Sequence, residues 1–209
     1  MKDVQNSQDQ RGVPIQQVGV KGVRLPFLIK TKEGGYQEVL ANISFTASLP
    51  KEYKGTHMSR FLEIMEPYRR RSLAEPEMET MLREALGRLD AESAVIKIAF
   101  TYFVEKTAPV SRRSSLLDLD CFFEGRLTLD EPLRFTLGVN VPVTSLCPCS
   151  KEISKYGAHN QRGVCRVELA FHQGFPCIFI EDLAKLVEAQ ASSPIYPLLK
   201  REDEKFVTE

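Results

Sequence analysis

The chain has 209 residues, 43% hydrophobic and 27% charged, a composition typical of a globular protein that can bury a core. Lysine plus arginine equals aspartate plus glutamate at 28 each, which excludes a general electrostatic attraction to nucleic acid or membranes. The longest apolar runs are far shorter than the ~20 residues that span a bilayer. Five cysteines make a poor disulfide framework, so we predict a cytoplasmic protein with free thiols.

The first half predicts two strands, two helices and two further strands. Residues 1–17 are polar and lack apolar periodicity, so we expect an extended arm. "VGVKGVRLPFLIK" predicts a strand interrupted at Gly22, and Val39–Leu49 alternates apolar and polar residues as a half-covered strand does. Two helices follow, with Ser59 as the expected N-cap of the first and Pro76 in the first turn of the second. The second helix has a stripe that we predict to be core, namely Met78, Met81, Leu82, Ala85 and Leu89.

The second half predicts a similar order of elements that stops early. "LRFTLGVNVPV" and "GVCRVELAFH" predict strands, "IEDLAKLVEAQAS" predicts a helix, and the chain ends in the polar "KREDEKFVTE". Runs of alternating strands followed by helices indicate an α+β protein with antiparallel sheets. If the second half repeats the first, a second helix and two more strands are missing; the order of elements alone leaves this repeat open.

"VTSLCPCSKEISKYGAHNQRG" brings Cys147, Cys149 and His159 close together in a stretch that predicts neither a helix nor a strand. Zinc knuckles and thioredoxin-like redox pairs place two residues between their cysteines, so the single Pro148 fits neither. On an extended backbone the two thiols would point to opposite sides, which favours separate roles. Cys147 and His159 predict half of a metal site or a nucleophilic cysteine paired with histidine, and chance proximity stays open.

A third ligand is needed if this is a metal site. A catalytic zinc commonly takes three protein ligands and leaves one position for water, so a carboxylate is the natural third. Glu152 and Glu168 are nearby in the sequence, while the acidic cluster of Glu202, Asp203 and Glu204 could arrive from further along. The residues alone leave this choice open.

Two groups of basic residues predict contacts with an anion. "EKTAPVSRRSS" combines Lys106, Arg112 and Arg113 with hydroxyl side chains in a loop between strands, a composition suited to phosphate. His57 precedes a predicted helix and lies beside Arg60 in the sequence, where a helix N-terminus favours an anion. Either group can equally be an ordinary solvated surface.

The motifs together resemble GTP cyclohydrolase of type IB, a folate-pathway family unrelated in sequence to the common type IA form. The resemblance extends from about Asp3 to the last residue. It rests on "PVTSLCPCSKEIS", "YGAHNQR", "GTHMSRF", the "K-TAPVS" loop with "SLLD-D", and the opening "DVQ-S-D-RG-PI--VGVKG-R-P".

The resemblance implies a tunnelling fold of tandem ββααββ modules with antiparallel sheets and helices on one face. We expect a first module with its N-terminal arm at 1–128 and a second, truncated after its first helix, at 129–209. The implied reaction converts GTP and water into 7,8-dihydroneopterin triphosphate and formate. Because such modules leave sheet edges exposed, we expect a homotetramer with GTP sites at subunit interfaces, and no nucleic-acid or membrane partner.

The resemblance carries the metal-ligand and catalytic roles to Cys147 and His159. It carries the third ligand role to the glutamate of "LLK--DEK", here Glu204, with Glu202 as the fallback; Cys149 would support the site without binding the metal. Thiolate, imidazole and carboxylate suit one divalent metal per site, zinc first and manganese or iron as alternatives. The expected triphosphate contacts are His57, Arg60, Lys106, Arg112 and Arg113.

The resemblance also implies a guanine-anchoring glutamate and a proton-transfer histidine beyond the last residue of this chain. We therefore expect a truncated form that has no turnover as it stands.

Two other functions stay open. One is a nitrile reductase of queuosine synthesis, which shares the implied fold and uses a cysteine nucleophile without a metal. The other is a non-catalytic zinc-binding module.

Overall fold

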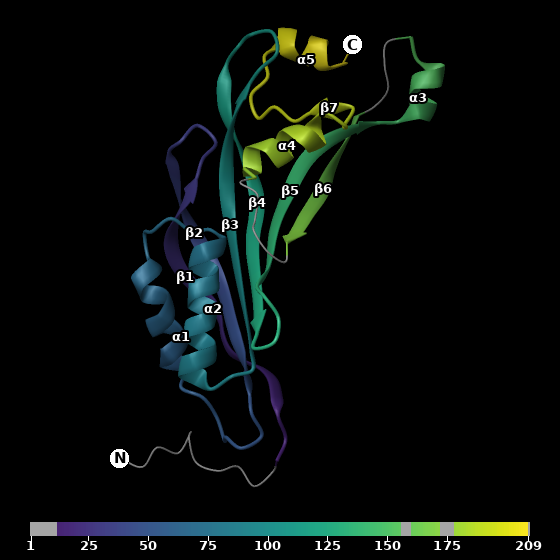
Figure 1. Ribbon diagram of the computed structural model, residues 1–209. Coiled ribbons are helices and arrows are strands. Elements are labelled where there is room, and N and C mark those ends of the chain that lie inside the picture. Colours follow the sequence, from purple (N-terminus) through teal and green to yellow (C-terminus); the bar gives the residue numbers. More distant parts are fainter. Residues whose placement is uncertain (1–11, 156–159, 172–177, 209) are drawn as a thin grey trace. The chain divides into compact units, whose positions relative to one another are not determined.

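The computed structural model describes residues 12–155, 160–171 and 178–208 (Figure 1). The predicted arm up to residue 11 lies outside this part. In chain order the elements are β1 (Ile15–Lys30), β2 (Tyr36–Leu49), α1 (Met58–Met65), the 3-10 helix η1 (Glu66–Tyr68), α2 (Glu75–Leu89), β3 (Ser93–Thr107), β4 (Ser114–Thr128), β5 (Arg134–Leu146), α3 (Pro148–Ile153), β6 (Asn160–Phe171), α4 (Ile180–Glu188), β7 (Ser193–Pro194) and α5 (Arg201–Thr208). No helix in the described ranges is long and apolar enough to cross a membrane.

One seven-stranded sheet contains the described strands, in the order β1-β2-β3-β4-β5-β6 with β7 paired to β5. The pairings β1–β2, β2–β3 and β5–β7 are antiparallel. The predicted fold class, a tunnelling fold of tandem ββααββ modules with helices on one face, is therefore wrong. Because β5 hydrogen-bonds to β4, the strands of both halves join in one sheet, and the elements after β4 alternate between strand and helix.

The chain divides into two compact units that are interleaved along the sequence. The described residues of unit 1 fall within 1–100, 122–137 and 169–177. Those of unit 2 fall within 101–121, 138–168 and 178–209. Strands β3, β4, β5 and β6 thus contribute residues to both units. The module boundary predicted between residues 128 and 129 follows sequence order and stays a prediction.

Strands β1 and β2 of unit 1 pair along most of their lengths. The alternate apolar residues of Val39–Leu49 are buried, as the period of two predicts. The register of β1 shifts between Lys21 and Val23, where Gly22 has a φ of 75°. The interruption predicted at Gly22 is therefore a β-bulge, and the positive φ explains why glycine stands there.

Helices α1 and α2 complete the core of unit 1. Pro76 lies in the first turn of α2 as predicted, and the apolar stripe that includes Met78 and Met81 is buried. On α1, the buried Phe61 meets Phe45 of β2 edge to face, with ring centroids 5.2 Å apart. Aromatic and methionine side chains from helices and strands therefore pack into a single apolar core, which is the main favourable term in folding.

In unit 2, β7 and the residue before it are fixed to β5 by polar contacts. Thr144 Oγ1 donates to the Ser193 carbonyl at 2.8 Å, and the Leu146 N–H donates to Ser192 Oγ at 3.0 Å. The helix predicted from "IEDLAKLVEAQAS" is α4, which buries apolar residues together with one acid. The buried residues of α4 are Ile180, Leu183, Ala184 and Glu188.

Three local predictions need correction. Helix α1 begins at Met58 with His57 as its N-cap, two residues before the predicted N-cap Ser59. The stretch predicted to be neither helix nor strand contains α3, since Pro148 suits the first turn of a helix. Strand β1 begins at Ile15, within the predicted arm.

Candidate functional site

Cys147 and Cys149 lie at the start of α3 in unit 2, on either side of Pro148. Cys147 is the N-cap residue, with an extended backbone at φ −78° and ψ 114°, and it is half-buried. Cys149 is in the helix and is exposed. The two thiols thus have different environments, which agrees with separate roles.

The first turn of α3 favours the thiolate of Cys147. Hydrogen bonds from the Ser150 hydroxyl and the Ser150 backbone N–H lower the pKa of Cys147, and Cys149 adds smaller contributions in the same direction. Partial burial opposes them and is outweighed. In contrast, burial raises the pKa of Cys121 in β4 far above its ordinary value, so that cysteine stays a thiol. Because the thiolate binds metals and attacks electrophiles, Cys147 is suited to both predicted roles.

Helix α5, also in unit 2, carries the predicted third ligand. Glu204 is exposed in the first turn, and its backbone N–H donates to the Lys200 carbonyl at 2.9 Å. The fallback ligand Glu202 is exposed as well. Glu152 on α3 and Glu168 on β6 are also exposed. Exposure therefore does not distinguish the four carboxylates.

His159 lies outside the described residues, so the predicted ligand set is described only in part. Among the residues that the structure does describe, no three His, Cys, Asp or Glu side chains form a cluster that could hold a metal. The two predicted ligands that the structure describes, Cys147 and Glu204, both belong to unit 2. A half-buried thiol with a lowered pKa and an exposed carboxylate are donors that fit a divalent metal such as zinc.

Asp203 differs from the two glutamates beside it, although the sequence presents all three as one acidic cluster. It is 0% exposed. Its Oδ1 accepts the N–H groups of Val110 (2.9 Å) and Ser111 (2.8 Å), and its Oδ2 accepts the Ser111 hydroxyl (2.6 Å) and the Lys200 N–H (2.8 Å). Burial, the largest effect, would raise the pKa of Asp203, but the donors from Ser111, Lys200 and Val110 outweigh it and hold that pKa well below its ordinary value.

The loop between β3 and β4, which we predicted to hold phosphate, binds this carboxylate of the chain itself. The Ala108 N–H donates to the Arg113 carbonyl at 2.9 Å and closes the loop. Arg112 has a φ of 57°, and the side chains of Arg112 and Arg113 are exposed. The loop's backbone donors are thus partly used by Asp203, whereas its two guanidinium groups lie at the surface.

Lys106, another predicted triphosphate contact, pairs with Glu188 of α4. The pair is largely buried, with the side chain of Lys106 14% exposed and that of Glu188 7% exposed. Four residues earlier on β3, the Tyr102 hydroxyl donates to Glu181 Oε1 at 2.7 Å. Two polar contacts therefore fasten α4 to β3, and neither was predicted. Glu181 and Glu188 are seven residues apart on the helix, a spacing that places them on one face and was the available signal.

His57 and Arg60 belong to unit 1. His57 is half-buried as the N-cap of α1, without a side-chain hydrogen bond to the cap. Arg60 Nη1 donates to the backbone carbonyl of Arg88, in the last turn of α2, at 2.8 Å. The guanidinium of Arg60 thus contacts a helix C-terminus, where a cation is favoured. A triphosphate contact at these two residues stays a prediction.

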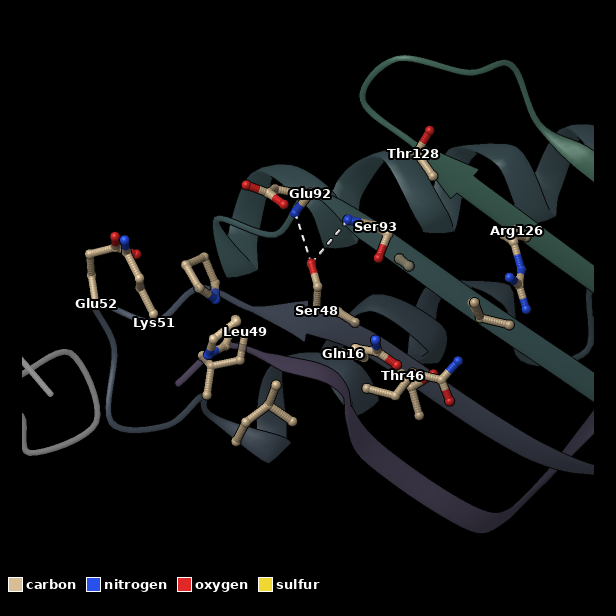
Figure 2. A pocket seen from close by; sticks show the side chains of 17 residues that line it. Gln16, Thr46, Ser48, Leu49, Lys51, Glu52, Glu92, Ser93, Arg126 and Thr128 are labelled. Atoms are coloured by element: carbon tan, nitrogen blue, oxygen red, sulfur yellow. Dashed lines mark hydrogen bonds between the residues drawn. The ribbon is translucent and has the colours of Figure 1, made fainter. Parts of the chain in front are cut away.

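Unit 1 contains a pocket of about 600 Å³ between the start of β1, the end of β2, the start of β3 and the end of β4 (Figure 2). Ser48 Oγ accepts the N–H groups of Glu92 at 3.0 Å and Ser93 at 3.1 Å, shown as dashed lines in Figure 2. Arg126 and Lys51 bring positive charge to the lining. Of the residues described, none that we predicted for the site lines this pocket.

Comparison with known proteins gives a match over the whole chain. A model of the family described as type I GTP cyclohydrolase folE2 matches residues 1–209. A protein named GTP cyclohydrolase FolE2 from Geobacter sulfurreducens is 49% identical over 209 residues, covering 100% of this chain and 79% of the relative. The FolE2 of Geotalea uraniireducens is 49% identical, with 100% and 75% covered. That of Azoarcus sp. is 47% identical over 207 residues, with 99% and 76% covered.

Proposed function

This chain belongs to the type I GTP cyclohydrolase folE2 family, and we propose that it opens the imidazole ring of GTP by hydrolysis. The products are 7,8-dihydroneopterin triphosphate and formate, and the reaction is the first step of tetrahydrofolate synthesis. The observation that carries the proposal is the family match over residues 1–209, which include the motifs at Cys147 and Glu204.

The subdivision within GTP cyclohydrolases is a finer question. The residues resemble type IB, whereas the matching family and the relatives carry the name FolE2. The comparisons support the coarser statement, a type I GTP cyclohydrolase of the FolE2 family. The type IB designation stays a proposal that rests on the motifs quoted from the sequence.

Three residues of this chain are proposed to hold one divalent metal: Cys147, His159 and Glu204. The lowered pKa of Cys147 supports the proposal for that residue, and the family motif that contains Glu204 supports it for the carboxylate. The mixed set of sulfur, nitrogen and oxygen donors favours zinc and also accommodates manganese or iron. When bound, such a metal lowers the pKa of a water molecule toward about 7, which suits addition of water to C8 of the purine.

The other residues of α3 and of the β3–β4 loop have supporting roles in this proposal. Cys149 is exposed inside the helix and supports the loop without binding the metal. The exposed guanidinium groups of Arg112 and Arg113 are suited to the triphosphate, which leaves the reaction uncleaved. Lys106 is engaged with Glu188, so its contribution to phosphate binding would require breaking a buried pair.

The assembly proposed for the protein is a homotetramer with GTP sites shared between subunits. In the described sheet β1 and β6 are the terminal strands, and terminal strands offer unpaired backbone groups to another chain. Val164 of β6 is 65% exposed, an apolar side chain at that edge. Light scattering at micromolar protein concentration tests the assembly, and a monomer would contradict it.

The decisive test of the function is formate release from GTP in the presence of zinc. It should be measured on this chain and on a fusion that adds the residues of the Geobacter sulfurreducens relative that the match does not cover. Release by either protein, lost in Cys147→Ala, supports the proposal. Release by neither contradicts it. A nicotinamide-dependent reduction of a nitrile in place of formate release would favour the nitrile reductase.

A further inference from the structure

Helix α5, which carries the proposed ligand Glu204, has little apolar packing to hold it. Among its eight residues, Arg201–Thr208, Asp203 is the only buried one. The side chains of Glu202, Glu204 and Phe206 are exposed. Helices this short are marginally stable in water without tertiary contacts. The position of α5 in unit 2 therefore depends on what Asp203 contacts.

The carboxylate of Asp203 joins two segments that are remote in sequence. Its contacts with Val110 and Ser111 fix it to the β3–β4 loop, and its contact with the Lys200 N–H fixes the residue immediately before α5. Both oxygens are used, two donors to each. A carboxylate held from both sides cannot rotate or slide without losing charge-assisted hydrogen bonds.

We propose that Asp203 is the positioning residue for Glu204: it clamps the first turn of α5 to the β3–β4 loop and so sets where the Glu204 carboxylate lies. The inference rests on the proposed role of Glu204 as a metal ligand. The two residues are neighbours, and their Cα atoms are about 3.8 Å apart, so a fixed Asp203 leaves Glu204 little freedom beyond its own side-chain rotamers. The same clamp holds the loop that presents Arg112 and Arg113.

A matched control distinguishes positioning from a general loss of stability. Glu77 on α2 also uses its carboxylate to accept a backbone N–H, that of Ala74, at 3.0 Å. It belongs to unit 1 and is not a predicted site residue. Asp203→Asn and Glu77→Gln therefore each weaken a carboxylate that binds backbone at a helix start, but only the first does so beside a proposed ligand.

The experiment measures zinc affinity by competition with a chromophoric chelator, and thermal unfolding of the same samples, for the 209-residue chain and its variants. We expect Asp203→Asn to weaken zinc binding about ten-fold or more, the size typical of residues that orient a metal ligand. Glu77→Gln should lower the unfolding temperature and leave zinc affinity within about two-fold of the parent, because distant sites act independently. Asp203→Asn combined with Glu204→Gln should bind zinc no more weakly than Glu204→Gln alone.

The outcomes separate this inference from the proposed function. If Glu204→Gln weakens zinc binding and Asp203→Asn does not, the positioning role is overturned and the ligand assignment survives. Fully additive losses in the double variant would also overturn the positioning role, since Asp203 would then act independently of Glu204. If Glu204→Gln has no effect, the ligand assignment fails and this inference fails with it.

If the Asp203→Asn protein does not fold, Ser111→Ala tests the positioning role of Asp203 instead. It removes the hydroxyl donor and leaves the carboxylate with its three backbone donors. A loss of zinc affinity of about three-fold, smaller than for the ligand itself, supports the positioning role. Unchanged zinc affinity in a folded Ser111→Ala protein overturns it.

Discussion

The core of unit 1 is apolar, whereas unit 2 buries charged side chains. In unit 1, aromatic and methionine residues of β2, α1 and α2 pack together, as Phe45, Phe61 and Met81 do. Among the described residues, the two buried charged side chains, Glu188 and Asp203, both belong to unit 2. The buried polar residues described in unit 1 are uncharged threonines.

This difference indicates which segments of the chain are held in place by polar contacts rather than by apolar packing. A buried charge costs free energy unless it is paired and hydrogen-bonded, so it is retained only with specific partners. In unit 2 those partners are residues of the candidate site or their neighbours: Glu188 pairs with Lys106, and Asp203 precedes Glu204. Apolar packing thus stabilises unit 1, and polar contacts fix the segments that carry the proposed chemistry.

The largest effect is expected in the apolar core of unit 1. Phe61→Ala removes a completely buried ring that contacts Phe45, and such a change typically costs about 4 kcal/mol of unfolding free energy. Denaturant unfolding followed by circular dichroism measures it. Leu62→Ala, at the neighbouring position that is 45% exposed, is the control and should cost far less. Equal losses would mean that α1 does not pack as described.

A somewhat smaller effect is expected when the buried pair of unit 2 is broken. Lys106→Met leaves Glu188 buried without its cation, which we expect to cost about 3 kcal/mol. The double variant Lys106→Met, Glu188→Leu removes the charge as well and should recover most of that loss. If the double variant is as unstable as the single one, the pair is not the source of the cost and the contrast between the units weakens.

The second polar contact of α4 should contribute less. Tyr102→Phe removes the hydroxyl that donates to Glu181 and keeps the buried ring, so we expect a loss of about 1.5 kcal/mol, as for a hydrogen bond to a charged group. Denaturant unfolding with Phe103→Leu as the exposed neighbouring control measures it. No measurable loss would show that the contact between Tyr102 and Glu181 does not stabilise α4.

The smallest effect is expected for charges at the surface of unit 1. Arg83 pairs with Glu79 one turn away on α2, with the Arg83 side chain mostly exposed. Arg83→Ala should change the unfolding free energy by only about 0.3 kcal/mol, and less in high salt, because such pairs are solvated and screened. A loss as large as that of Lys106→Met would contradict the distinction between surface and buried charge.

Local structure in unit 1 could be predicted because the spacing of apolar residues along a strand or helix reflects which of its faces is buried. The alternation in Val39–Leu49 and the stripe on α2 identify the faces that the core covers, and Gly22 and Pro76 mark a bulge and a helix start. The sheet as a whole could not be predicted. Whether β5 joins β4 or begins a second sheet depends on pairing between strands, which alternation within one strand does not encode.

The candidate site was only partly predictable for a related reason. The cysteines were recognisable because few residue types bind metals, and the family motif singled out Glu204. Nothing local distinguished Asp203 from Glu202, because its burial depends on donors from Val110 and Ser111, far away in the sequence.

The central claim, that unit 2 holds a metal through Cys147 and not through Cys149, is tested most directly by elemental analysis of folded protein. Protein purified with zinc should keep about one zinc per chain in the parent and in Cys149→Ala. Cys147→Ala should lose it, because the neighbouring thiol is on the exposed side of the first turn of α3 and has a different environment. Equal zinc loss in the two variants, or full retention in Cys147→Ala, would contradict the claim.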